Sequence, residues 1–227
     1  MVRLAILCVL LGGASTADAG ACARPDIPSV PITRDGAAIT AKGGVVVTLD
    51  DVAKPPAWQF TSGKRTVPAT AKTLGPGLVV LAVPAGGDWV LADDKGTKLI
   101  AVKHAAVEPK PLPAPKVSVV THETWSNGRR GNSTMVLATI EDPIPADAVA
   151  LVVLDDKGAM RSFLALMSPQ GPGALPIYNS GSCTVKPNGT LPTNPTDVIS
   201  LAWIDSSGRT SALTKMTVKS IKTPAKP

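Results

Sequence analysis

The sequence contains few of the side chains on which ligand and cofactor sites commonly depend. Aromatic residues make up 3% of the 227 residues, and Tyr178 is the single tyrosine. Sugars and single-stranded nucleic acids are usually held by stacking on several aromatic rings, so this composition disfavours a binding face of that kind. The chain has two histidines, His104 and His122, and no C-x-x-C pair of cysteines. We therefore expect no zinc site.

Catalytic motifs are equally scarce. His122 is followed by a glutamate, but the second histidine of the H-E-x-x-H zinc motif is missing. The segment Ser180–Cys183 does not match the G-x-S-x-G nucleophile elbow, and no glycine-rich phosphate loop is found. The acidic pairs Asp93-Asp94 and Asp155-Asp156 precede glycines in turn-like segments, where aspartate usually caps a turn rather than binding calcium. We expect no catalytic residue, no metal and no cofactor.

One apolar run stands out, and it lies at the N-terminus. Arg3 is followed by the run Leu4–Leu11 and then by small residues ending in Ala17-Asp18-Ala19. A basic residue, a short apolar core and an A-x-A site form the layout of a secretory signal peptide. The run is too short to span a bilayer as a stable helix. The sequence therefore predicts export, with a signal peptide at residues 1–19.

Cysteine use is sparse and fits an exported chain. Cys8 lies inside the signal peptide, which leaves Cys22 and Cys183 in the mature protein. A single pair in an oxidising compartment predicts a disulfide, which would close a very long loop and stabilise the fold by about 4–5 kcal/mol. Two alternatives stay open. Ala19-Gly20-Ala21 before Cys22 loosely resembles a bacterial lipobox, which would lipidate Cys22, and both thiols could remain free.

A proline-rich segment divides the mature chain. Residues 108–116 carry proline at every second position from Pro109 to Pro115. Such a segment cannot join the interior of a sheet and forms an extended, semi-rigid spacer of roughly 25 Å. Strand-like segments flank it on both sides. The sequence therefore predicts one β domain over residues 20–107, a linker over 108–116 and a second β domain over 117–222.

Short apolar runs separated by turn signals predict strands on both sides of the spacer. The predicted strands are 44–49, 58–60, 78–83, 88–92, 97–104, 117–124, 133–141, 148–154, 159–166, 197–204 and 210–221. Residues 168–195 are rich in proline, glycine, serine and asparagine, and we predict a long connection there. The run Val198–Ile204 is apolar on both faces, which is typical of a strand covered on both sides.

The same hairpin pattern, an aspartate followed by two polar residues and a glycine, occurs three times. Asp93–Gly96, Asp155–Gly158 and Asp205–Gly208 each begin with aspartate and end with glycine, and the first two are identical tetrapeptides. Glycine at the last position supplies the positive φ of a type I turn followed by a G1 bulge. The repetition is compatible with a duplicated domain, although turn chemistry alone would select similar residues.

The last hairpin carries a resemblance to known modules. Asp205–Ser211, following Leu201-Ala202-Trp203, resembles the D-x-x-G-x-x-S turn near the end of fibronectin type III-like and related bacterial Ig-like domains. Asp35-Gly36-Ala37, leading into a short strand, is similar to Ig-like modules of exported bacterial proteins. The resemblance implies an all-β fold of two small antiparallel sandwiches. It departs from the pattern in one place, because no tyrosine precedes the last hairpin at the position of a tyrosine corner.

Such modules imply spacing, adhesion or binding roles. We expect a non-enzymatic binding or structural protein of the cell envelope, located in the periplasm, at the surface or in the medium, or anchored through a lipid on Cys22. Its partner would be another protein or an envelope component, and no nucleic-acid motif accompanies the net charge of +6. The basic groups form a solvated surface or make peripheral contact with an anionic envelope. An accessory or inhibitor protein that binds an exported enzyme, and an enzyme with an unrecognised site, are the alternatives.

Export predicts a processed N-terminus. If residues 1–19 form a signal peptide, the protein recovered from outside the cytoplasm begins at Gly20, because Ala17 and Ala19 occupy the cleavage positions. N-terminal sequencing of the exported protein checks this. A chain that still begins at Met1 would contradict the prediction, whereas a blocked, lipidated Cys22 would keep export and establish the lipoprotein alternative.

Overall fold

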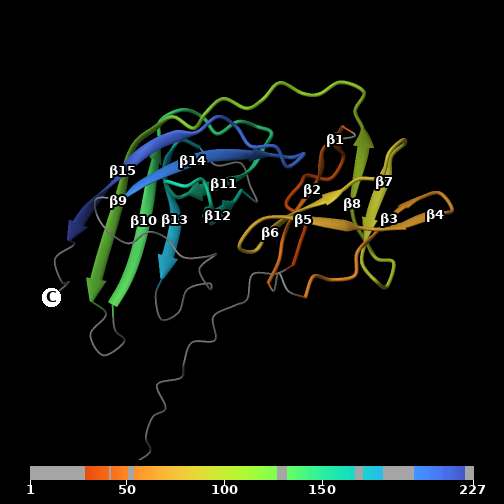
Figure 1. The fold of residues 1–227 in the computed structure, drawn as a ribbon, viewed down its shortest axis with the longest axis horizontal. Coiled ribbons are helices and arrows are strands. Elements are labelled where there is room, and N and C mark those ends of the chain that lie inside the picture. The colour runs from red at the N-terminus through yellow and green to blue at the C-terminus, as the bar shows by residue number, and fades with distance from the viewer. Residues whose placement is uncertain are drawn as a thin grey trace, which may run out of the picture.

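The fold is all-β, as the sequence predicts, and Figure 1 shows its two groups of strands. The computed structural model describes residues 29–40, 42–50, 54–126, 132–166, 171–180 and 197–222. No helix occurs in those ranges. None of the residues that the structure describes forms a helix long and apolar enough to cross a membrane. The predicted signal peptide, Cys22 and Cys183 lie outside the described residues.

Strands β1–β8, here called the N-terminal half, form two sheets. Their bounds are β1 Ala37–Ile39, β2 Gly44–Thr48, β3 Gln59–Ser62, β4 Arg65–Pro68, β5 Thr70–Gly75, β6 Leu78–Ala82, β7 Trp89–Ala92 and β8 Lys98–His104. One sheet has the order β1-β8-β7-β3-β4 and the other the order β2-β6-β5. Phe60, Leu81 and Trp89 are among the buried side chains that fill the core of this half.

Strands β9–β15, the C-terminal half, form one strongly curved sheet. Their bounds are β9 Val117–Ser126, β10 Asn132–Ile140, β11 Ala148–Leu154, β12 Met160–Ala165, β13 Gly173–Ser180, β14 Val198–Asp205 and β15 Thr214–Lys222. The order is β12-β11-β14-β15-β9-β10-β13. The two end strands lie close to each other: the Ser162 hydroxyl on β12 donates a hydrogen bond to the Ile177 carbonyl on β13 at 3.1 Å. The sheet is thereby nearly closed around a core that contains Trp203.

Strand pairing departs from the purely antiparallel expectation in the same way in both halves. β1 pairs with β8 in parallel, and β9 pairs with β15 in parallel, whereas the other pairs are antiparallel. In each half, then, the first strand lies beside the last. This arrangement brings the start of each half next to its end and leaves β1 at the edge of its sheet.

Most predicted strands are present, and one expectation is wrong. β13 lies inside residues 168–195, where we expected only a connection. It pairs along β10, and Leu175 and Ile177 alternate into the core while Ala174 and Pro176 are exposed. Proline is tolerated because β13 is the last strand in the order of its sheet, where a missing N–H interrupts no second row of ladder bonds. The glycines and prolines of this segment therefore hid from sequence analysis the alternation of buried and exposed residues that is typical of a strand.

The three hairpin turns have the predicted conformation. Gly96, Gly158 and Gly208 have φ of 80°, 80° and 84°. The first aspartate of each turn accepts bonds from backbone N–H groups: Asp155 Oδ1 accepts from Lys157 at 2.9 Å and Ala159 at 2.8 Å. The Ala159 N–H, helped by the Arg161 side chain, holds the pKa of Asp155 below its usual value. These aspartates cap turns, as the sequence predicts.

The two halves share a third apolar cluster, which lies between their cores. The N-terminal half contributes Ile32, Val46 and Leu78. The C-terminal half contributes Val149, Ala150, Val152, Phe163, Ala202 and Ile204. This cluster explains why β14 is apolar on both faces: Leu201 and Trp203 face its own core, whereas Ala202 and Ile204 face the other half. β2 is covered in the same way.

Adjacent residues of β2 therefore face different apolar clusters, which allows the two clusters to be tested separately. Val46 faces the shared cluster, and Val47 faces the core of the N-terminal half. Val46→Asp would place an unpaired charge between the halves, a cost that separation of the halves relieves. We expect this variant to unfold in two calorimetric transitions and to have a larger radius of gyration by small-angle X-ray scattering. Val47→Asp cannot be relieved by separation, so it should unfold the N-terminal half. Identical behaviour of the two variants would contradict this assignment.

Candidate functional site

The junction between the halves is held by polar contacts around the shared cluster. The Thr33 hydroxyl donates to the Ser206 carbonyl at 2.8 Å, and the Gly44 N–H donates to the Ser207 carbonyl at 2.9 Å. Both acceptors belong to the Asp205–Gly208 turn of the C-terminal half. The last hairpin turn thus projects onto the N-terminal half, and its backbone carbonyls are used as acceptors there.

Asp205 keeps that turn in shape. Its Oδ1 accepts from the backbone N–H groups of Ser207 at 3.0 Å and Arg209 at 2.9 Å, and its Oδ2 accepts from Arg209 Nε at 2.8 Å. Asp205 is 1% exposed. Because its carboxylate is satisfied by local donors, the charge can be buried at the junction without a cost that the fold must meet elsewhere.

The proline-rich segment is fastened to the structure at several points. Arg209 Nη1 donates to the Pro109 carbonyl at 2.8 Å, and the Thr214 hydroxyl donates to the Pro115 carbonyl. Glu108 lies 3.9 Å from Lys42, and Leu112 packs against the core of the C-terminal half. Figure 1 shows this segment running along one side of the molecule from β8 to β9. Residues 108–116 therefore act as a strap across the junction as well as a connection.

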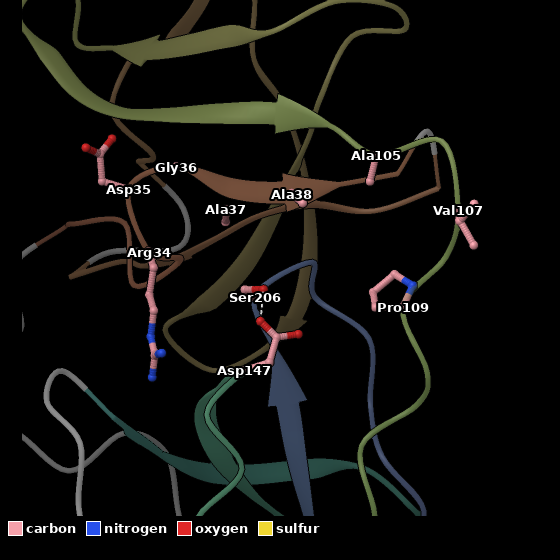
Figure 2. A pocket seen from close by; sticks show the side chains of 10 residues that line it. All are labelled: Arg34, Asp35, Gly36, Ala37, Ala38, Ala105, Val107, Pro109, Asp147 and Ser206. Carbon is pink, nitrogen blue, oxygen red and sulfur yellow. Dashed lines mark hydrogen bonds between the residues drawn. The ribbon is translucent and has the colours of Figure 1, made fainter.

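A cleft of about 570 Å³ opens beside the strap, at the junction. Its walls come from three parts of the chain, which Figure 2 shows facing one another. Arg34–Ala38 provide one wall and Ala105, Val107 and Pro109 form the end near the strap. Asp147 and Ser206, from the C-terminal half, provide the opposite wall. The volume lies within the usual range for ligand sites, roughly 300–1,000 Å³.

The charged groups of the cleft differ in whether they already have partners. Asp35 accepts from the Ala101 N–H at 2.6 Å and lies 3.9 Å from Lys98 Nζ. Asp147 accepts from the Ser206 hydroxyl. The Arg34 side chain is exposed and pairs with no group in the described part of the chain. The cleft therefore offers one free guanidinium beside two carboxylates that are already engaged.

The two histidines that the sequence analysis considered are not brought together. His104 is exposed on β8, and His122 is buried on β9 in the other half. Within the described residues, no group of three or more histidine, cysteine, aspartate or glutamate side chains is placed to hold a metal. Cys22 and Cys183, the candidate disulfide, lie outside the described residues, so their pairing stays a prediction.

Sequence reasoning missed the cleft. Arg34, Asp147 and Ser206 are far apart in the chain and carry no motif. One signal was available, because the runs Val45–Val47 and Val198–Ile204 are apolar on both faces and require a second covering surface. That pattern predicts that something packs on these strands, but it does not identify what.

Comparisons with known proteins give distant likenesses. No protein-family model matches the chain, and no curated protein matches it. Among solved structures, it is similar to "Biofilm associated protein - BSP domain", at 15% identity and a TM-score of 0.28, over 86% of this chain and 30% of that one. It is also similar to SGBP-B of the Bacteroides ovatus mixed-linkage glucan utilization locus, solved with a mixed-linkage heptasaccharide, at 12% identity and a TM-score of 0.24. The second match covers 86% of this chain and 47% of that one, so this chain spans less than half of either structure.

Two turn glycines test the junction directly. Gly158 and Gly208 share a positive φ, but a Cβ at Gly158 would meet nothing within 4 Å, whereas one at Gly208 would lie 2.6 Å from Val80 Cγ2 of the other half. Gly158→Ala should cost about 1–3 kcal/mol from backbone strain alone. Gly208→Ala should cost more, because it also forces the halves apart. Chemical denaturation measures both free energies of unfolding, and equal losses would show that the turn at Gly208 does not seat against Val80.

Proposed function

We propose that this chain is an exported, non-enzymatic binding protein of the bacterial cell envelope, and that its ligand binds in the junction cleft. The observation that carries this proposal is the cleft itself, which is formed jointly by the two halves and the strap. The shared apolar cluster keeps its walls at a fixed separation. A site formed in this way is ready before the ligand arrives, so binding does not have to meet the entropic cost of ordering its walls.

In this proposal the two halves are Ig-like or fibronectin III-like sandwiches, over residues 20–107 and 117–222, with the strap at 108–116. In the C-terminal half the two layers of the sandwich would be continuous in the one nearly closed sheet. Three features support it. Each half has its own apolar core, each pairs its first strand with its last in parallel, and the remaining pairs are antiparallel. Sandwich modules of this kind are scaffolds whose function is carried by loops and by surfaces between modules.

The export part of the proposal rests on the sequence. Residues 1–19 would be removed as a signal peptide, and the mature protein would reside in the periplasm, at the surface or in the medium. A disulfide between Cys22 and Cys183 would then form in the oxidising compartment. The partner is another protein or an envelope component, and the net charge of +6 favours approach to an anionic envelope.

The experiment uses the full mature protein and a variant that fills the cleft. Ala38 is exposed and lines the cleft, so Ala38→Trp occupies the site without entering either core. Ala71→Trp makes the same change at an exposed position of β5, away from the cleft, and is the matched control. Both are mixed with purified sacculi and envelope vesicles of the source organism, and the bound fraction is measured by sedimentation.

We expect Ala38→Trp to weaken retention by about tenfold, which corresponds to roughly 1.4 kcal/mol, and Ala71→Trp to leave it unchanged. Equal retention of the two variants would show that the cleft is not the contact. A protein found in the cytoplasm and retained by no envelope fraction would overturn the proposal as a whole.

A further inference from the structure

The cleft exposes the free edge of a β-strand. Among the strands that the structure describes, β1 is the terminal strand of its sheet and pairs with β8 alone. The Ile39 carbonyl accepts from the Ala105 N–H at 2.9 Å, so Ile39 directs its backbone groups toward the β8 side. Alternate residues of a strand direct these groups to opposite edges. The N–H and C=O of Ala38 therefore point away from β8, on the wall of the cleft that Ala38 lines.

The other sheet edges in the described part of the chain are guarded. β4 carries Arg65 and ends at Pro68, and β5 carries Lys72, residues that discourage pairing with another strand. The end strands β12 and β13 approach each other, and the outer side of β2 accepts a bond from the N–H of Ile32 at 2.9 Å. β1 carries only alanine and isoleucine, so among these edges it alone has no charged residue, proline or covering strand, and its short length of three residues is its sole protection.

The side chains beside this edge are small. Gly36, Ala37, Ala38 and Ala105 carry at most one methyl group each and line the cleft together. A second backbone can therefore approach β1 to the spacing of neighbouring strands, about 4.8 Å. None of the lining residues is aromatic, so the cleft offers no surface for stacking a sugar ring.

Charge selects the kind of strand that fits. Arg34 precedes β1, lines the same cleft and has no partner in the described ranges, whereas Asp35 and Asp147 already accept hydrogen bonds. A guanidinium forms its strongest contacts with a carboxylate, often through two parallel hydrogen bonds. The complement of this site is an extended chain with an acidic side chain.

We infer that the cleft binds an extended peptide segment of a partner protein, which pairs with Ala38 along the free edge of β1 and places a carboxylate on Arg34. This inference rests on the proposed function, since it names the class of ligand for the same cleft. Backbone hydrogen bonds to Ala38 supply affinity that is independent of sequence, and Arg34 supplies the preference for an acidic residue.

The probes are capped pentapeptides of alternating valine and threonine in which each position in turn carries a single glutamate. Binding to the mature protein is measured by isothermal titration calorimetry. We expect at least one of these peptides to bind, glutamine in place of its glutamate to weaken binding about tenfold, and N-methylation of alternate peptide bonds to abolish it.

The protein variants assign the contact. Arg34→Gln should remove the preference for glutamate over glutamine, whereas Lys64→Gln, an exposed cation outside the cleft, should keep it. If Arg34→Gln retains the preference, or if the N-methylated peptide binds as well as its parent, the inference is wrong. If no peptide binds while Ala38→Trp still weakens retention by the envelope, the peptide inference fails and the proposed function stands.

Discussion

The apolar cluster between the halves is the contact on which the other features of the junction depend. Each large side chain that it buries, such as Val46, Phe163 or Ile204, contributes roughly 1.5–3 kcal/mol relative to exposure. The hydrogen bonds from Thr33 and Gly44 to the opposite turn each contribute only about 0.5–1.5 kcal/mol. Burial of apolar surface therefore holds the halves together, and the polar contacts fix their relative orientation. Without the cluster, the two halves would not be held in the relative position that the strap and the cleft require.

The last hairpin turn shows how one local device acquires a second role. The turn that begins at Asp155 only connects the two strands of its hairpin, and a Cβ at Gly158 would meet no atom within 4 Å. At Asp205 the same geometry is pressed against the N-terminal half, where Ser206 and Ser207 present carbonyls and Gly208 leaves room for Val80. The aspartate and glycine are required by the turn itself, whereas the absence of a Cβ at Gly208 is also required by the packing. Arg209 then links the turn to the strap.

The sequence predicts the fold better than it predicts the site, for physical reasons. Strands such as β11 and β14 have apolar patterns that only a sheet can bury, and glycine at position 158 or 208 marks its turn unambiguously. β4 and β5 escape detection because exposed edge strands need no apolar period, and β13 because its glycine and proline imitate a loop. The cleft depends on which faces meet across the junction. Arg34 and Asp147 line the same cleft only after both halves have folded and packed, so no local sequence pattern predicts that they lie near each other.

A fixed junction has consequences for binding. Two modules on a flexible linker must lose relative freedom when a ligand bridges them, and that loss is subtracted from the affinity. Here the shared cluster and the strap have already removed this freedom during folding. In the proposed function, a short ligand with few contacts binds across Arg34, Ala38 and Ser206 without having to close the site itself. The same rigidity keeps the three-residue edge of β1 accessible, because Asp147 and Ser206 are held in contact with each other rather than across the cleft.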